Sequence, residues 1–293
     1  MSRLFAVLIL LVFAMQGYSQ ETASAIKYNY SAFYDASSTT LVNHNAVANF
    51  KQNFSKSSIA YTGTFNAYGF EYAMADVPFT VAGLENINSL ELGITYTQKT
   101  GNNWSIIAAV TPEVVADFES GIALKDIYPG FFAGAGYTTS DKKSQLTFGA
   151  GYKGYFGKYR LLPIVNFSRK VNEKLFYTIG IPATSLSYTI NQKHRIKSEI
   201  TADGFYSRIR GDNYFYNIGQ STELKIDALQ MVMVTGGVEY NYTSDDNWIA
   251  SFKVGHNLYN SLDAIDGQDK KHEIGFNNDI NISVGFIYNI NFN

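Results

Sequence analysis

The chain has 293 residues, a formal net charge of −2 and no cysteine. The near-neutral charge argues against a nucleic-acid-binding protein and against a strongly basic protein of the membrane surface. Without cysteine there is no disulfide framework, no thiolate chemistry and no lipid-modified cysteine. Aromatic residues make up 15% of the chain, with 24 glycines and 5 prolines, and this composition favours strands and turns over helices.

The N-terminal residues 1–19 are typical of an export signal. Arg3 supplies the positive charge, and the following stretch from Leu4 to Met15 is apolar. This stretch is too short for a membrane-spanning helix, which needs about 20 residues, so a signal peptide is favoured over an N-terminal anchor. Small residues at Gly17 and Ser19 occupy the positions before a cleavage site.

Residues 20–293 are predicted to form one domain of short strands with alternating apolar and polar residues, punctuated by polar turns. We expect strands, in chain order, at residues 26–34, 57–65, 68–72, 90–97, 104–110, 127–138, 146–153, 159–167, 175–181, 186–190, 196–202, 224–228, 232–242, 248–254 and 280–293. The clearest hairpin joins residues 90–97 and 104–110 through a turn at residues 101–103.

The last run, INISVGFIYNINFN at residues 280–293, alternates between large apolar residues and small or polar residues with one exception. Large apolar residues occupy every second position from Ile280 to Phe292, and only Ile287 interrupts the small and polar residues between them. This run is long enough to cross a bilayer as a tilted strand. We expect it to pair with the first strand and close the sheet.

Three features favour a barrel in a membrane over a soluble β-sandwich, which alternation alone also permits. The faces opposite the apolar ones are polar, tight turns alternate with longer loops such as residues 111–125, 206–220 and 261–273, and aromatic residues recur near strand ends. The recurring aromatic residues are Tyr28, Tyr34, Tyr96, Trp104, Tyr152, Tyr242 and Trp248. We therefore predict an all-β, closed antiparallel transmembrane β-barrel of about 12 strands, within 10–14.

Charged residues on the polar faces are expected to point inward. They are Lys27, Lys153, Arg195, Lys197, Glu199, Glu223, Lys225, Asp227, Glu239 and Lys253. They could line a water-filled lumen or pair with one another and plug it, and a barrel of this size permits both.

Two segments resemble known families. The alternating last strand, with Phe292 at the penultimate place, resembles the C-terminal assembly signal of outer-membrane β-barrels of Gram-negative bacteria. Residues 159–204, through LLPIV, NEKLFYTIGIP and LSYTINQKHRIKSE, resemble a family of uncharacterised outer-membrane proteins with a domain of unknown function. The resemblance implies a location in the cell outer membrane and contact with its lipid and lipopolysaccharide. It also implies recognition of the C-terminal strand by the barrel assembly machinery, and it supplies no active-site residues.

The residues best suited to catalysis, metal binding or anion binding do not form a recognisable site. The four histidines, His44, His194, His256 and His272, lack a metal-binding spacing, and His256 is the one that a membrane-embedded hydrolase could use. Four acidic residues in the loop around Gly267, namely Asp263, Asp266, Asp269 and Glu273, could hold Ca²⁺ but lack the EF-hand spacing. Arg208 and Arg210 could form a basic patch or a solvated turn.

The sequence therefore predicts no catalytic, cofactor-binding or metal-binding residue, no cofactor and no enzymatic activity. The leading functional interpretation is a passive channel or a structural component of the outer membrane. A surface binding or adhesion scaffold with a plugged lumen and a membrane-embedded hydrolase remain as alternatives. The sequence leaves the solute, the partners and the oligomeric state open.

Overall fold

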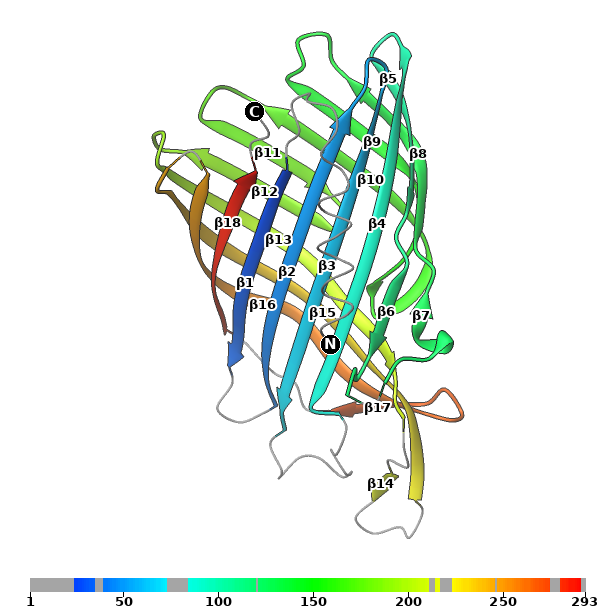
Figure 1. Cartoon of the computed structure of the whole chain (residues 1–293). Coiled ribbons are helices and arrows are strands. Elements are labelled where there is room, and N and C mark those ends of the chain that lie inside the picture. Colours follow the sequence, from blue (N-terminus) through cyan, green and yellow to red (C-terminus); the bar gives the residue numbers. More distant parts are fainter. Residues whose placement is uncertain are drawn as a thin grey trace.

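The computed structural model describes residues 24–34, 39–72, 84–119, 121–210, 214–216, 223–245, 247–274 and 280–290. These residues form one antiparallel sheet that closes on itself as a barrel (Figure 1). The predicted signal peptide and Phe292 lie outside the described residues. No helix in the described part of the chain is long and apolar enough to cross a membrane.

Fourteen strands form the wall of the barrel. In order around the ring they are β1 (Ser24–Tyr34), β2 (Thr40–Asn53), β3 (Ser57–Glu71), β4 (Asn86–Gly101), β5 (Trp104–Val110), β8 (Phe131–Thr138), β9 (Ser144–Phe156), β10 (Lys158–Lys170), β11 (Leu175–Gly180), β12 (Ala183–Thr189), β13 (His194–Arg208), β15 (Glu223–Thr243), β16 (Trp248–Asp266) and β18 (Ile280–Ile290). The ring closes between β1 and β18, whose register runs from Ser24 opposite Ile290 to Tyr34 opposite Ile280. The predicted pairing of the first and last strands is confirmed.

Shorter elements extend this wall at one end. They are β6 (Glu113–Ala116), β7 (Ile127–Tyr128), β14 (Tyr214–Tyr216), β17 (Lys271–Ile274) and the 3₁₀ helix η1 (Leu124–Asp126). β6 continues the line of β5 along β4 after an interruption at Pro112. Three of these elements, β6, β14 and β17, fall wholly or largely in segments that the sequence predicted to be loops.

The wall has 14 strands, against the predicted number of about 12 within 10–14. One of the 14, β2, has no counterpart among the predicted strands. Its outward residues include His44, Ala46 and Ala48, which do not give a recognisable apolar alternation. Two other wall strands, β3 and β15, were each predicted as two separate strands. In β15, residues 228–234 are apolar on both faces except at Gln230, so the alternation that marks a strand is locally lost.

The outward side of the wall carries an apolar belt. In β18, Ile282, Val284 and Phe286 are exposed by 48%, 49% and 40%. Strands all around the ring contribute similar residues, among them Leu92, Ile106, Phe148, Val165, Leu186, Val238, Phe252 and Val254. Of the predicted aromatic residues, Tyr34, Tyr96, Trp104, Tyr242 and Trp248 are exposed large side chains. A soluble protein would cover so continuous an apolar surface.

The two ends of the barrel differ in their connections (Figure 1). One end, called here the short-turn end, has the turns at residues 54–56, 102–103, 139–143, 171–174, 190–193 and 244–247, together with the start of β1 and the end of β18. In four of these turns a side-chain oxygen accepts the backbone N–H two residues ahead, from Asp141, Asn172, Asn191 and Asp245. Such Asx turns explain why these short polar sequences reverse the chain. The opposite end, called the long-loop end, carries the longer connections.

Candidate functional site: a polar lumen closed at one end

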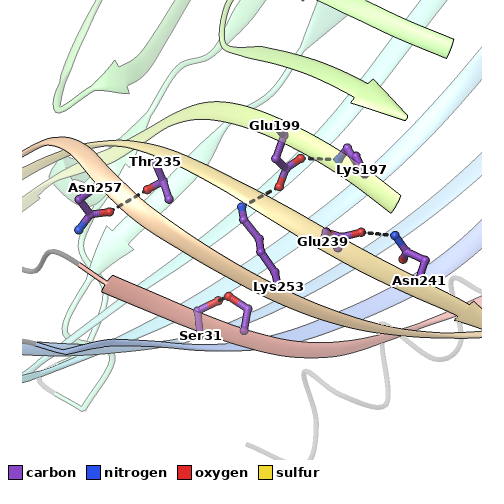
Figure 2. A network of polar contacts seen from close by, with 9 residues as sticks. Ser31, Lys197, Glu199, Thr235, Glu239, Asn241, Lys253 and Asn257 are labelled. Carbon is purple, nitrogen blue, oxygen red and sulfur yellow. Dashed lines mark hydrogen bonds and ion pairs between the residues drawn. The ribbon is translucent and has the colours of Figure 1, made fainter. Parts of the chain in front are cut away.

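A cluster of four charged residues lies on the inner wall (Figure 2). Lys253 Nζ lies 2.7 Å from Glu199 Oε1, and Lys197 pairs with the other oxygen of the same carboxylate. Glu239 lies opposite Lys197 on one side and Lys253 on the other in the strand ladder. Because two lysines face two glutamates, the cluster is electrically balanced, and it stabilises β13, β15 and β16 against one another.

Further hydrogen bonds extend this polar surface around the ring (Figure 2). Asn241 Nδ2 donates to Glu239 Oε1 at 2.7 Å, and Thr235 Oγ1 donates to Asn257 Oδ1 at 3.0 Å. At the closing pair of strands, Ser283 Oγ donates to Ser31 Oγ at 2.8 Å. The inner face of β1, β13, β15, β16 and β18 is therefore polar where their outer face is apolar.

The opposite part of the inner wall has its own polar contacts. Asn66 accepts a hydrogen bond from Asn45 at 2.8 Å and donates one to Ser89 at 3.1 Å, which links β2, β3 and β4. Lys153 Nζ lies 2.5 Å from Glu91 Oε2, so an ion pair connects β9 to β4, which are not neighbours in the wall. This pair crosses part of the lumen and confirms that at least some inward charges pair with one another.

Not all the predicted inward charges line this lumen. Lys153, Lys197, Glu199, Glu239 and Lys253 take part in the contacts above. Lys27 lies on the inner face of β1, and Arg195 is exposed where β13 begins. Glu223, Lys225 and Asp227 belong to the first residues of β15, where Lys225 and Asp227 are exposed and the strand extends past the wall. Their placement corrects the prediction, because alternation specifies the face of a strand but not its position along the barrel axis.

The lumen is closed toward the long-loop end by an apolar cluster, called here the seal. Tyr68 of β3 and Phe205 of β13 contact each other with ring centroids 5.0 Å apart, and Phe70 and Phe205 with centroids 6.2 Å apart. β3 and β13 lie nearly opposite each other in the ring, so these rings meet across the lumen. The other members include Phe33, Leu41, Ile87, Val115, Ile226, Leu229, Met231, Met233, Leu262 and Ile274, all buried.

The seal forms because parts of β13 and β15 curve into the barrel. A Cβ on Gly157, in the turn between β9 and β10, would lie 2.6 Å from Gln230 Cγ and 2.9 Å from Val232 Cγ2. Since both of these residues lie on the outer face of β15, the turn covers that face while Met231 joins the seal on the other. β15 and β16 are locally irregular at Val234, and such bulges bend a strand pair. The residues of the seal were missed from the sequence, although a run apolar on both faces in β15 is the signal that could have revealed them.

A strip of apolar side chains follows the lumen wall on the side of β5, β8 and β10. A Cβ on Gly151 would lie 3.4 Å from Ile164 Cγ1 and 3.6 Å from Phe132 Cδ2, and one on Gly136 would lie 3.3 Å from Ile107 Cδ1. Glycine at these positions leaves room for the three larger side chains, which we call the apolar strip: Ile107, Phe132 and Ile164. The strip lies beside the Lys153–Glu91 ion pair, because β9, which carries Lys153, runs between β8 and β10.

The histidines do not meet in the lumen. His44 Nδ1 lies 2.8 Å from Tyr28 Oη, and His194 Nδ1 lies 2.6 Å from Tyr240 Oη, both on the outer surface. His256, which the sequence nominated for hydrolysis, is also exposed on the outer face, opposite Ile280 of β18. Its position outside the lumen separates it from the polar residues that could have assisted it.

The acidic loop around Gly267 is a closed hairpin between β16 and β17. Asp263 pairs with Lys271 at 2.7 Å, and Asp266 lies 2.9 Å from His272 Nε2. Asp266 Oδ1 also accepts the backbone N–H groups of Gln268 and Lys270. These hydrogen bonds, that from His272 first, hold the pKa of Asp266 below its ordinary value. Among the described residues no group of three or more side chains is placed to hold a metal ion.

The two arginines hold the long-loop end together instead of forming an open basic patch. Arg210 pairs with Asp126, which is fully buried at the end of η1, and Arg208 Nη1 donates to the carbonyl oxygen of Lys125 at 3.3 Å. The segment after β13 is therefore tied to the segment before β7. The basic patch and the solvated turn that the sequence left open both overlook these partners, because residues far away in the chain approach the arginines only in the folded barrel.

Residues 74–293 match the model of a family described as a domain of unknown function, DUF6268. The chain belongs to this family. The predicted resemblance to such a family is thereby confirmed, and no curated protein matches the chain.

The chain is similar in fold to solved porin structures. A KdgM porin in complex with disordered oligogalacturonate has 11% identity, a TM-score of 0.39 and coverage of 91% of this chain and 99% of that one. A FadL homologue of Pseudomonas aeruginosa has 11% identity, a TM-score of 0.47 and coverage of 92% and 90%. The NanC porin has 7% identity, a TM-score of 0.38 and coverage of 92% and 100%.

Proposed function

We propose that this DUF6268 protein is an outer-membrane β-barrel whose lumen serves as a conduit for small molecules. The observation that carries the proposal is the closed ring with an apolar outer belt and charged residues inside. Hydrocarbon offers no hydrogen-bond partner to the backbone, so a sheet that crosses a bilayer must close and leave its polar side chains inside. β1 and β18 are each long enough to cross a bilayer when they are tilted.

The orientation follows from the two ends. Barrels of this class place short turns and both chain ends on the periplasmic side and longer loops outside. We infer that the short-turn end faces the periplasm, and that the seal lies toward the cell exterior. The last strand would then be the one that the barrel assembly machinery recognises, and the belt would contact outer-membrane lipid and lipopolysaccharide. The proposal assigns no catalytic step and no cofactor to the barrel.

The membrane part of the proposal is tested by extraction and electrophoresis. The protein is expected to require detergent for extraction and to migrate faster on a gel before heating than after it, because a closed barrel resists unfolding by the gel detergent. A protein that dissolves without detergent and migrates equally in both samples would contradict it.

A second candidate function, a surface scaffold with a permanently plugged lumen, is favoured by one observation, the seal. Planar-bilayer conductance separates the two. A steady unit current through the wild-type protein would support the conduit, and silence of the wild-type protein at all voltages would support the scaffold. A variant with both Phe70→Ala and Phe205→Ala should pass a larger current than the wild type in either case, because the rings that meet across the lumen are removed. Phe252→Ala, which removes an outward ring, serves as the matched control and should behave as the wild type does.

A further inference from the structure

A second group of charged residues lies on the inner wall next to the seal, apart from the balanced cluster on β13, β15 and β16. Lys153 of β9 pairs with Glu91 of β4 at 2.5 Å, and it also interacts electrostatically with Glu113 of β6 and Asp203 of β13. We call these four residues the Lys153 group. Three carboxylates share one lysine here, so the group is short of positive charge.

Two of the carboxylates are fixed by uncharged neighbours. Glu113 accepts hydrogen bonds from the side chains of Tyr159 and Ser89. Asp203 has Tyr68 Oη 3.5 Å from one of its oxygens. These contacts hold both carboxylates at the lumen side of the seal, to which Tyr68 belongs, but they supply no compensating charge.

The nearby cationic side chains have partners of their own. Arg160 faces Lys153 in the β9–β10 ladder, but its guanidinium lies over the ring of Phe156, 5.4 Å from the centroid. Lys153 Nζ lies over the ring of Tyr155, 5.3 Å from the centroid, beside the Glu91 carboxylate. A carboxylate next to an aromatic face is a typical environment for an ammonium group. This part of the lumen therefore already accommodates one ammonium group, that of Lys153.

The uncompensated carboxylates can be reached from the lumen. Asp203 is the most open member of the Lys153 group, since it is exposed although protein surrounds it. Carboxylates enclosed in a membrane protein are costly unless a positive charge compensates them, and they commonly mark the path of a substrate or ion. A cation that enters the lumen would supply the charge that the chain lacks.

A buried amide oxygen at the same end of the lumen lacks a hydrogen-bond donor. Asn43 is 8% exposed, and within the part of the chain that the structure describes its Oδ1 accepts no hydrogen bond. It lies on the inner face of β2, opposite Tyr68 in the β2–β3 ladder. Because Tyr68 reaches Asp203 from this position, Asn43 faces the space that the Lys153 group borders. An unpaired buried acceptor costs free energy, which a donor on a bound molecule would recover.

The missing partner is an organic cation. Among the described residues no group of three or more side chains is placed to hold a metal ion, whereas a longer molecule can span separated carboxylates. Apolar surface lies alongside, because Gly151 shares the inner face of β9 with Lys153, and Phe132 and Ile164 of the apolar strip lie against it. Ammonium and hydrocarbon groups on one molecule would match these two neighbouring surfaces.

We propose that the Lys153 group and the apolar strip form a binding site for a small alkylamine. Its ammonium group contacts Glu113 and Asp203, and its hydrocarbon chain lies on the strip. This inference rests on the proposed function and deepens it, since it names organic cations as the solutes of the conduit. The site lies on the lumen side of the seal, so binding does not require the seal to open.

The test is isothermal titration of the purified protein in detergent with 1,4-diaminobutane. The wild type should bind it saturably, whereas the uncharged 1,4-butanediol should not bind. Glu113→Gln and Asp203→Asn each remove one carboxylate and keep the shape of the side chain. Each should weaken binding about tenfold, because a charge-assisted hydrogen bond is lost. Glu173→Gln, which removes an exposed carboxylate from the turn at residues 171–174, is the matched control and should bind as the wild type does.

Lys153→Met separates a role in binding from a role in folding. It removes the ammonium group that competes for the carboxylates, so this variant should bind 1,4-diaminobutane more tightly than the wild type. Damage to the structure would instead weaken binding. Each variant is first required to migrate as a folded barrel before heating, and Asp203→Asn replaces Glu113→Gln if the latter does not.

Three results would overturn the site. They are the absence of saturable binding to a folded wild type, equal binding of the diol, and equal affinities of the wild type and both carboxylate variants. Displacement of the amine by an equal concentration of Ca²⁺ would also refute an organic cation, because it would indicate a metal site. The proposed location fails separately, when the protein needs no detergent and its migration does not depend on heating. A heat-dependent barrel that does not bind the amine would refute this inference alone.

Discussion

The two ends of the barrel show how one strand responds to different surroundings. In β15, residues 235–242 alternate between an inner polar face, with Glu239 and Asn241, and an outer apolar face, with Val238 and Tyr240. Toward the seal, residues 228–234 are apolar on both faces except at Gln230, and nearly all of them are buried. Alternation of apolar and polar residues therefore indicates a strand with lipid on one side and the polar lumen on the other. Its loss indicates a strand packed between two layers of protein.

The largest expected effect lies in the seal. Leu229 is fully buried there, and Leu229→Ala should lower the free energy of unfolding by about 3 kcal/mol, because it removes contacts and leaves a cavity. Leu186→Ala, on the outer face of β12, should cost roughly 1 kcal/mol, since lipid or detergent fills the space. Urea unfolding in detergent, followed by gel migration, measures both. Equal losses would mean that the seal is no better packed than the belt.

A smaller loss of stability is expected for a change in the charged cluster, which lies nearer the short-turn end of the barrel. Glu199→Gln keeps the shape of the side chain but leaves Lys197 and Lys253 facing each other without their shared carboxylate. Since the cluster is partly solvated, a loss of about 1–2 kcal/mol is expected.

Adding Lys253→Met to Glu199→Gln should restore part of that loss, because it removes one of the two like charges. The same urea titration of the two single variants and the double variant measures the coupling. Strict additivity would show that the charges act independently and that the cluster does not hold the strands together.

The smallest effect is local and depends on pH. The pKa of Asp266 lies below its ordinary value of 3.8, so its hydrogen bonds stabilise the β16–β17 hairpin fully above about pH 4. That stability is lost as the pH falls through the lowered value, when the carboxylate becomes protonated. Hydrogen exchange at Lys271, corrected for the intrinsic rate, should therefore accelerate below pH 4. Asp266→Asn should exchange faster at neutral pH and lose this dependence; an unchanged variant would exclude the carboxylate as the cause.

Most of the wall could be predicted from the sequence, but its completeness could not. The two-residue period located thirteen of the fourteen wall strands at least in part, because a strand between lipid and a polar lumen needs a different chemistry on each face. β2 was missed because its outward residues His44, Ala46 and Ala48 are not strongly apolar, so the strand shows no clear alternation. The charged cluster was predicted as a set of inward residues that either line the lumen or pair with one another. Which residues pair could not be predicted, because it depends on the register between strands.

The sequence by itself determined the class of the protein, through the alternation from β1 to β18, and it fixed the short turns through Asp and Asn residues that bond to the next backbone groups. Only the tertiary structure decided where the lumen ends. The seal unites Tyr68 and Phe205 from distant strands. Such contacts depend on how far strands are shifted along one another, a quantity that no local pattern of residues encodes.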